Sequence, residues 1–212
     1  MRKTPPFVYA LLAFTLAGCG LFEHHEDYYP MGIGSTWTYE VHDWEMTPSG
    51  TDTLYNGTDT IKATKNDRLP TGEDVVLFIR TITYEPDTAS DSTVEVDSNY
   101  VRMGGDCVLQ YANKADTTVP DTVLKLPLAK DVSWFRWGAR VKVTEESDVT
   151  VKAGTYRAWK VEAIYDSTYH GLSASWWFAD GVGEIQSHFV SPSGIPGYTY
   201  VTHRELDRAT IR

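Results

Sequence analysis

The residues best suited to chemistry in this chain are two cysteines and six histidines. A thiolate acts as a nucleophile or a metal ligand, and an imidazole acts as a general base or a metal ligand. Neither residue type stands in a catalytic or metal-binding pattern. The sequence contains no His-Glu-x-x-His, no Gly-x-Ser-x-Gly, no phosphate loop ending in Gly-Lys-Ser/Thr and no Cys-x-x-Cys. We therefore predict no cofactor and no catalytic residue. The alternative is a hydrolase or metal-dependent enzyme whose site is formed by dispersed residues.

The histidines and acidic residues do not predict a metal site either. Four histidines are scattered without ligand spacing, and ligands from distant strands could still meet: His42, His170, His188 and His203. The run His24–Asp27 could bind a metal loosely, but neighbouring side chains rarely converge on one ion, and a solvated linker is favoured. The acidic residues between Glu85 and Asp97 suit Ca²⁺, yet they lack the spacing and the turn glycine of an EF-hand loop. A solvated loop is the simpler interpretation.

The first 18 residues have the layout of a secretory signal peptide. Arg2 and Lys3 provide a positive start, and an apolar run of 11 residues spans 7–17. This run is too short for a permanent membrane span, which needs about 20 apolar residues. The chain is therefore expected to be exported.

The residues that follow this run are more specific. Leu16-Ala17-Gly18 stands directly before Cys19 and resembles the lipobox of bacterial lipoproteins. The resemblance implies that Cys19 becomes residue one of the mature chain and carries a diacylglyceryl thioether and an acylated amine. Two or more acyl chains hold a protein stably at a membrane. Gly20, where an aspartate commonly retains such proteins at the inner membrane, favours the outer membrane, facing either the periplasm or the cell surface. The alternative is an ordinary secreted protein with a chance cysteine.

Composition and charge indicate a single acidic domain behind a tether. Residues 1–18 are the predicted signal, residues 19–29 the lipidated cysteine with a flexible tether, and residues 30–212 one domain with a substantial core. Removal of the signal takes away two cationic residues and no acid, so the net charge changes from −10 to −12. A negative field repels nucleic acid, and no nucleic-acid partner is expected.

Alternating apolar residues predict an all-β domain. Regular turn signals separate short strands, and no convincing helix follows residue 18. We predict roughly nine to eleven antiparallel strands in a strongly curved sheet or half-open barrel, with a two-sheet β-sandwich as the alternative. Asp74–Tyr84 is apolar on both faces, which suits a central strand or one that lines a cavity.

Three local features set the expected turns. Asn56-Gly57 predicts a turn, and Gly104-Gly105 predicts a two-residue hairpin loop that pairs Arg102 with Cys107. Residues 133–143 read as one strand, with Phe135 facing inward and Arg136 outward. The polar stretch 113–132 is expected to be a loop.

Three side chains are singled out by their surroundings. Cys107 falls on an apolar face, which favours a buried, inert thiol. Phe78 lies on the two-sided strand and is a candidate ligand-binding residue. Trp177 is the second candidate, because its neighbour Trp176 belongs to the core face and Trp177 must point to the other side. An exposed tryptophan can stack on a sugar, contact a partner or line an apolar groove, unless a loop or the tether covers it.

Several stretches together resemble a group of uncharacterised bacterial lipoproteins. They are Tyr28-Tyr29-Pro30, Gly34-Ser35-x-Trp37-x-Tyr39, Leu126-Pro127-Leu128 before Ser133-Trp134, Val151-x-Ala153-Gly154-Thr155-Tyr156, Trp159-x-Val161, and Trp177-Phe178-Ala179-x-Gly181-Val182-Gly183. The resemblance implies a curved antiparallel sheet, broadly similar to the half-barrels of periplasmic lipoprotein carriers. Its motifs mark turns and strands, and no site residue beyond Cys19 is implied.

These observations favour a non-catalytic binding or structural role. The expected protein is a lipoprotein of the cell envelope, anchored to the membrane through Cys19. Its domain would hold an apolar ligand, a glycan or an envelope protein.

Overall fold

The structure is a computed structural model that describes residues 26–86, 92–115, 119–136, 138–165 and 171–212. Within these residues twelve β-strands form one antiparallel sheet. The strands are β1 (Thr36–Thr47), β2 (Gly50–Arg68), β3 (Asp74–Pro86), β4 (Thr93–Gly104), β5 (Cys107–Tyr111), β6 (Asp121–Lys125), β7 (Ser133–Arg136), β8 (Ala139–Val151), β9 (Gly154–Ile164), β10 (Ser173–Ala179), β11 (Gly183–Pro192) and β12 (Thr199–Thr210). No helix in the described part of the chain is both long and apolar enough to cross a membrane.

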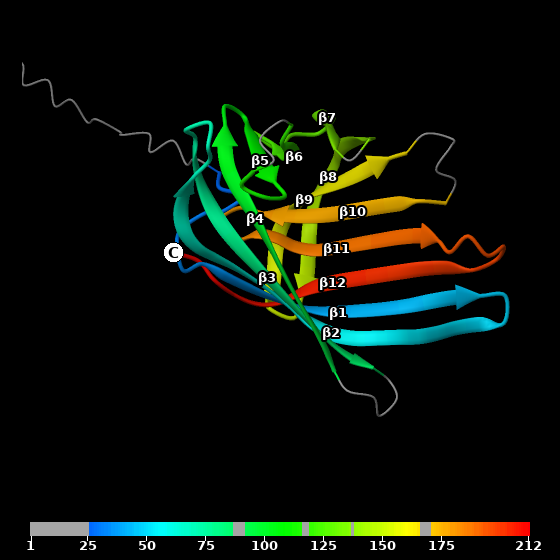
Figure 1. Cartoon of the computed structure of the whole chain (residues 1–212). Coiled ribbons are helices and arrows are strands. Elements are labelled where there is room, and N and C mark those ends of the chain that lie inside the picture. The colour runs from blue at the N-terminus through cyan, green and yellow to red at the C-terminus, as the bar shows by residue number, and fades with distance from the viewer. Residues whose placement is uncertain (1–25, 87–91, 116–118, 137, 166–170) are drawn as a thin grey trace, which may run out of the picture.

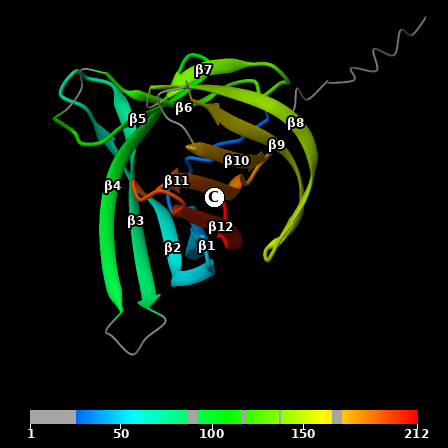
Figure 2. The same cartoon turned by 90° about the vertical axis from the view of Figure 1, so that its right-hand side faces the viewer.

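The sheet is a meander in which the first and last strands pair with each other. Its order is β6-β5-β4-β3-β2-β1-β12-β11-β10-β9-β8-β7, so β1 and β12 lie at its centre. The sheet curls until it nearly closes into a ring (Figure 2). The hairpins β1–β2 and β11–β12 extend side by side beyond this ring (Figure 1). The predicted all-β, strongly curved antiparallel sheet is therefore confirmed, and the two-sheet sandwich is not the fold.

Side chains close the seam between the two edge strands, β6 and β7. The indole Nε1 of Trp134 donates a hydrogen bond to the backbone oxygen of Thr122 at 3.0 Å. Beside it, Arg136 Nε lies 3.1 Å from Asp121 Oδ2. Trp134 and Arg136 are 8% and 9% exposed, so both interactions lie largely out of water. Edge strands carry unpaired backbone groups, and these contacts cover them in place of a hydrogen-bond ladder.

The predicted number of strands, nine to eleven, is too low for two local reasons. Residues 133–143 are two strands, β7 and β8, because Gly138 adopts a φ of 76° and turns the chain. Only glycine visits such a φ readily. Phe135 is consequently 75% exposed and Arg136 is buried, the reverse of the predicted faces. The stretch 113–132, expected to be a loop, contains β6.

Two predicted turns are also corrected. Asn56-Gly57 lies inside β2, where Gly57 pairs with Tyr84 and with Val41. A Cβ on Gly57 would come within 2.3 Å of the Thr83 backbone oxygen, so this glycine permits close strand approach and does not form a turn.

The β4–β5 hairpin has a different register from the predicted one. Gly104 pairs with Cys107, and Arg102 pairs with Leu109. The loop is therefore Gly105-Asp106, with Gly105 at a φ of 66°. A register change of two residues keeps every side chain on its face, which is why the alternation alone did not reveal it.

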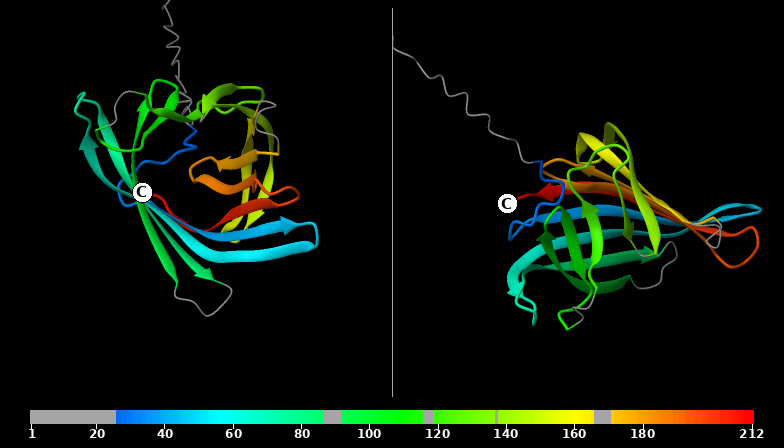
Figure 3. Two further views of the ribbon diagram at one scale, coloured as in Figure 1. Left: turned by 45° about the vertical axis from the view of Figure 1, so that its right-hand side comes forward. Right: turned by 90° about the horizontal axis from the view of Figure 1, so that it is seen from above.

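The segment before β1 crosses one end of the ring (Figure 3). Asp27 N donates to Asp180 Oδ1 at 2.6 Å, and the Asp27 backbone oxygen accepts from Gly181 N at 2.9 Å. Tyr28 is 4% exposed, and Pro30 is buried against Gly183. Residues 27–30, called the strap below, thus pack onto the domain. Residues 19–25 of the predicted tether and the signal lie outside the described residues.

The seam yields a direct test with neighbouring residues. Trp134→Ala removes a buried indole and its hydrogen bond across the seam, and we expect it to lower the free energy of unfolding by about 3–5 kcal/mol. Phe135→Ala, on the same strand with its side chain in solvent, should change it by less than about 0.5 kcal/mol. Urea unfolding followed by tryptophan fluorescence and by circular dichroism measures both. Equal effects would show that the seam does not depend on Trp134.

Candidate functional site

The inner face of the curled sheet carries a cavity of about 410 Å³ that is partly open to solvent. This volume lies within the range of roughly 300–1,000 Å³ that is usual for small-molecule sites. One part of its wall is apolar and includes Ile61, Phe78, Val123 and Trp176. The remaining wall is polar and includes Arg80, Asn99, Gln110, Arg136, Glu184 and Arg204. Such a lining suits a molecule with both an apolar and a polar part.

A buried carboxylate organises the polar wall. Asp59 on β2 is 0% exposed, and it accepts three hydrogen bonds from Arg80 on β3 at 2.8–3.1 Å. Arg204 on β12 bonds the same carboxylate and also Glu184 on β11. A buried charge is tolerated only when it is paired and hydrogen-bonded, and Asp59 meets this condition with two guanidinium groups.

The surroundings of Arg204 and Tyr39 shift the pKa of both side chains upward. Burial favours the neutral form of Arg204, but the carboxylates of Glu184 and Asp59 outweigh burial and raise the pKa of Arg204. Its guanidinium carbon lies 4.4 Å from the ring centre of Tyr39. Burial, followed by the charge of Glu184, raises the pKa of the Tyr39 phenol well above its usual value. Both groups are therefore fixed as a cation and a neutral donor, with Tyr39 donating to the Glu184 backbone oxygen at 2.9 Å.

Two polar atoms in this wall have no partner among the described residues. They are Arg204 Nε, a donor, and Asn99 Oδ1, an acceptor, and both are buried. Buried polar atoms are nearly always hydrogen-bonded in folded proteins, so an unpaired donor and acceptor beside one cavity require explanation.

Arg136 connects the seam to the cavity. Its guanidinium carbon lies 5.1 Å from the ring centre of Trp176, within the range of a cation–π interaction. The same side chain pairs with Asp121 across the seam. Arg136 therefore both closes the seam and packs against Trp176 in the cavity wall.

Phe78, a predicted ligand-binding residue, lies in the cavity wall and is 3% exposed. Tyr29 of the strap packs on it at a ring separation of 6.0 Å, and Trp37 packs at 6.1 Å. Burial raises the pKa of Tyr29 to about 12, so its phenol stays neutral. These rings also line a pocket of about 50 Å³, which has room for only a few water molecules. The strap thus forms one end of the cavity.

Trp177, the other predicted residue, lies on the opposite face of β10 from Trp176. It is half-buried, and the ammonium of Lys160 lies 5.4 Å from its ring centre. The structure does not bring Trp177 together with Phe78. Their roles in binding stay predictions.

Of the two cysteines, Cys107 lies within the described residues. Cys107 is half-buried, and burial together with Asp106 raises the pKa of its thiol, which makes the thiolate scarce at neutral pH. Cys19 lies outside the described residues, and its lipidation stays a prediction.

Three of the scattered histidines form a row on one face of the sheet. His42 on β1 pairs with His203 on β12, which pairs with His188 on β11. The rings of His188 and His203 are 6.0 Å apart. Burial, followed for His188 by the charge of Lys160, lowers the pKa of both imidazoles. His203 and Arg204 are consecutive and point to opposite faces, so the row follows the face opposite Arg204, although His188 also contributes to the lining of the cavity. His24, His25 and His170 lie outside the described residues.

The sequence analysis missed the residues of the polar wall. One signal was present: Arg80 stands between Phe78 and Ile82 at the spacing of two that puts all three on one face. Asp59 gave no such signal, because it lies in a polar stretch.

The buried carboxylate provides a stability test. Asp59→Asn removes the charge shared by Arg80 and Arg204, and we expect it to lower the free energy of unfolding by about 3–5 kcal/mol, because a buried ion pair is broken and Arg204 keeps only Glu184 as a partner. Asp52→Asn, at an exposed position of the same strand, is the matched control and should have almost no effect. Denaturant unfolding measures both. A loss below 1 kcal/mol for Asp59→Asn would contradict the pairing described above.

Comparisons with known proteins concern the fold. No protein-family model matches the chain, and no curated protein matches it. Solved structures that are similar include a candidate exported protein with a YmcC-like fold from Bacteroides fragilis (TM-score 0.40, 12% identity, 86% of this chain and 98% of that chain). A candidate lipoprotein from Parabacteroides distasonis gives the same values. A β-barrel-like protein of the domain of unknown function DUF1849 from Brucella abortus follows (TM-score 0.38, 9% identity, 87% of this chain and all of that chain).

Proposed function

We propose that this chain is a lipid-anchored protein of the bacterial cell envelope whose domain binds a ligand without transforming it. The anchor is the predicted lipid on Cys19, and the predicted location is the outer membrane. The lipobox-like Leu16-Ala17-Gly18-Cys19 and the following Gly20 support this part of the proposal. The net charge argues against nucleic acid as the ligand.

The cavity carries the proposal of ligand binding. Its apolar wall around Phe78 and Trp176 suits a hydrocarbon or ring system. Its polar wall includes the guanidinium groups of Arg136 and Arg204 and the amides of Asn99 and Gln110, which suit a polar group that accepts hydrogen bonds. The ligand class is therefore an amphipathic molecule of the envelope, with its apolar part against Phe78 and its polar group toward Arg204.

Two carboxylates at the polar wall, Asp59 and Glu184, support binding over proton transfer; Asp97 and His188 also line the cavity. A general base needs a carboxylate or imidazole that is free to take a proton from the substrate. Asp59 and Glu184 are instead held by arginines in ion pairs. An arrangement of this kind orients polar groups and stabilises the wall.

Filling the cavity should abolish binding. Ser187 on β11 lines the cavity, and Ser187→Trp introduces an indole into that space. We expect this variant to bind the hydrophobic probe N-phenyl-1-naphthylamine at least about tenfold more weakly than wild type, at a stability cost of about 1–3 kcal/mol. Fluorescence titration measures the affinity, and native mass spectrometry shows whether amphipathic molecules purify with each protein.

The control places the same side chain outside the cavity. Ser175 lies on β10 and pairs with His188 on the other face of the sheet, so Ser175→Trp should leave probe binding unchanged. If wild type binds neither the probe nor any cellular amphiphile, or if the two variants lose binding equally, the cavity is not the binding site.

The anchor has a separate test. Cys19→Ser removes the predicted acylation site, and we expect the protein to move from the membrane fraction to the soluble fraction and to incorporate no labelled palmitate. Cys107→Ser, which removes the other thiol, should leave the protein at the membrane. Retention of Cys19→Ser in the membrane pellet would contradict lipid anchoring without touching the cavity proposal.

A further inference from the structure

A cluster of metal-ligating side chains lies on the face of the sheet opposite the cavity. Glu40 and His42 stand two residues apart on β1, and Glu205 lies on β12 directly opposite Glu40 in the β1–β12 register. One ligand atom from each of the three lies within 4.8 Å of the other two, and all three side chains are half-buried. The spacing of two on a strand and the antiparallel register therefore bring an imidazole and two carboxylates to one point.

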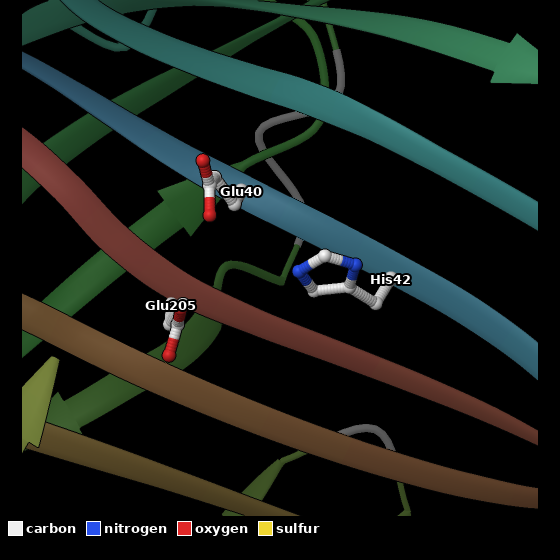
Figure 4. A group of neighbouring side chains, drawn as sticks. All are labelled: Glu40, His42 and Glu205. Atoms are coloured by element: carbon white, nitrogen blue, oxygen red, sulfur yellow. The ribbon is translucent and has the colours of Figure 1, made fainter. Parts of the chain in front are cut away.

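A hydrogen bond to Asn56 fixes the orientation of the His42 imidazole. His42 Nδ1 lies 2.8 Å from Asn56 Oδ1 on β2, and because an amide oxygen only accepts, Nδ1 is the donor. The lone pair is then on Nε2. Figure 4 shows Nε2 pointing toward the space between the carboxylates of Glu40 and Glu205. A metal-binding histidine typically has its second nitrogen held in this way.

We propose that Glu40, His42 and Glu205 bind a divalent transition-metal cation of the Zn²⁺ class. An imidazole with two carboxylates suits Zn²⁺ and similar first-row ions, whereas Ca²⁺ and Mg²⁺ prefer oxygen ligands throughout. His203 lies next to this group, with its Nε2 3.8 Å from Glu205 Oε2. The proposal concerns the outer face and does not depend on the cavity.

Lys152 competes with the metal for one carboxylate. Its ammonium contacts Glu40 and lies 3.4 Å from Asp207 Oδ1. The Lys152 side chain is 54% exposed, so it can move into water or remain on Asp207 when a cation takes Glu40. Two glutamates this close repel each other, and Lys152 or a metal relieves the repulsion.

Metal binding would join the two ends of the meander. The β1–β12 ladder is where the first and last strands meet, and the proposed ligands come from both. A ligand that binds only the folded state raises its stability by mass action. Zn²⁺ should therefore raise the melting temperature as well as bind.

The experiment uses the mature chain with Cys19→Ser, without a histidine tag. His24→Ala and His25→Ala are added to every sample, because these adjacent imidazoles could bind Zn²⁺ on their own. Isothermal titration calorimetry with Zn²⁺ should give one ion per chain, with at least tenfold weaker binding of Ca²⁺ and Mg²⁺. The melting temperature should rise when Zn²⁺ is added and return to its starting value when a chelator removes the metal.

Variants then test the named ligands. His42→Ala and the isosteric Glu205→Gln should each lower Zn²⁺ affinity at least about tenfold, and Asn56→Ala, which frees the imidazole, should lower it about tenfold. His188→Ala is the matched control, because it removes a histidine of the same face that is outside the proposed set; its affinity should equal that of the starting protein.

The Lys152→Gln variant tests the competition. Removal of this cation should raise Zn²⁺ affinity about three- to tenfold. Three results would each overturn the proposal: no Zn²⁺ bound by the folded protein, affinity unchanged in both His42→Ala and Glu205→Gln, or an affinity that falls in Lys152→Gln.

Discussion

The carboxylate of Asp59, enclosed between Arg80 and Arg204, is the interaction on which the sheet depends most. It joins β2 and β3 from the first half of the chain to β12 from the second, and Arg204 extends the link to Glu184 on β11. A slip of one residue in any of these strands would move a charge to the wrong face. The cluster therefore specifies register across the centre of the sheet.

Much of the fold could be predicted from the sequence, because alternation reports a half-buried strand directly. Trp176 and Phe178 follow this rule and are buried. The rule fails where one residue changes the course of the chain. At Gly138 a positive φ separates two strands that the alternation joined, and Arg136 is then buried. At Gly57 the sequence predicts a turn where the strand in fact continues. A glycine after asparagine is typical of a turn, but this glycine allows two strand backbones to approach closely.

The sites were harder to predict, because their residues are brought together by pairing between distant strands. Phe78 could be singled out because its strand is apolar on both faces. The same alternation places Arg80 on the face of Phe78. Nothing local connects Asp59 with Arg204, or His42 with Glu205, since each pair meets only through the β1–β12 ladder. That ladder requires the whole meander to form, and a single sequence does not state which strand its last strand will join.

The seam between β6 and β7 differs from every other strand boundary of the sheet, because side-chain contacts close it. Separating any other two neighbouring strands would break a ladder of backbone hydrogen bonds, and these bonds act together. Parting β6 from β7 disrupts chiefly the hydrogen bond of Trp134 and the ion pair of Arg136. At this place side chains, and not a backbone ladder, hold the ring together. Since Arg136 also lies against Trp176 in the cavity wall, one side chain takes part both in closing the ring and in shaping the cavity.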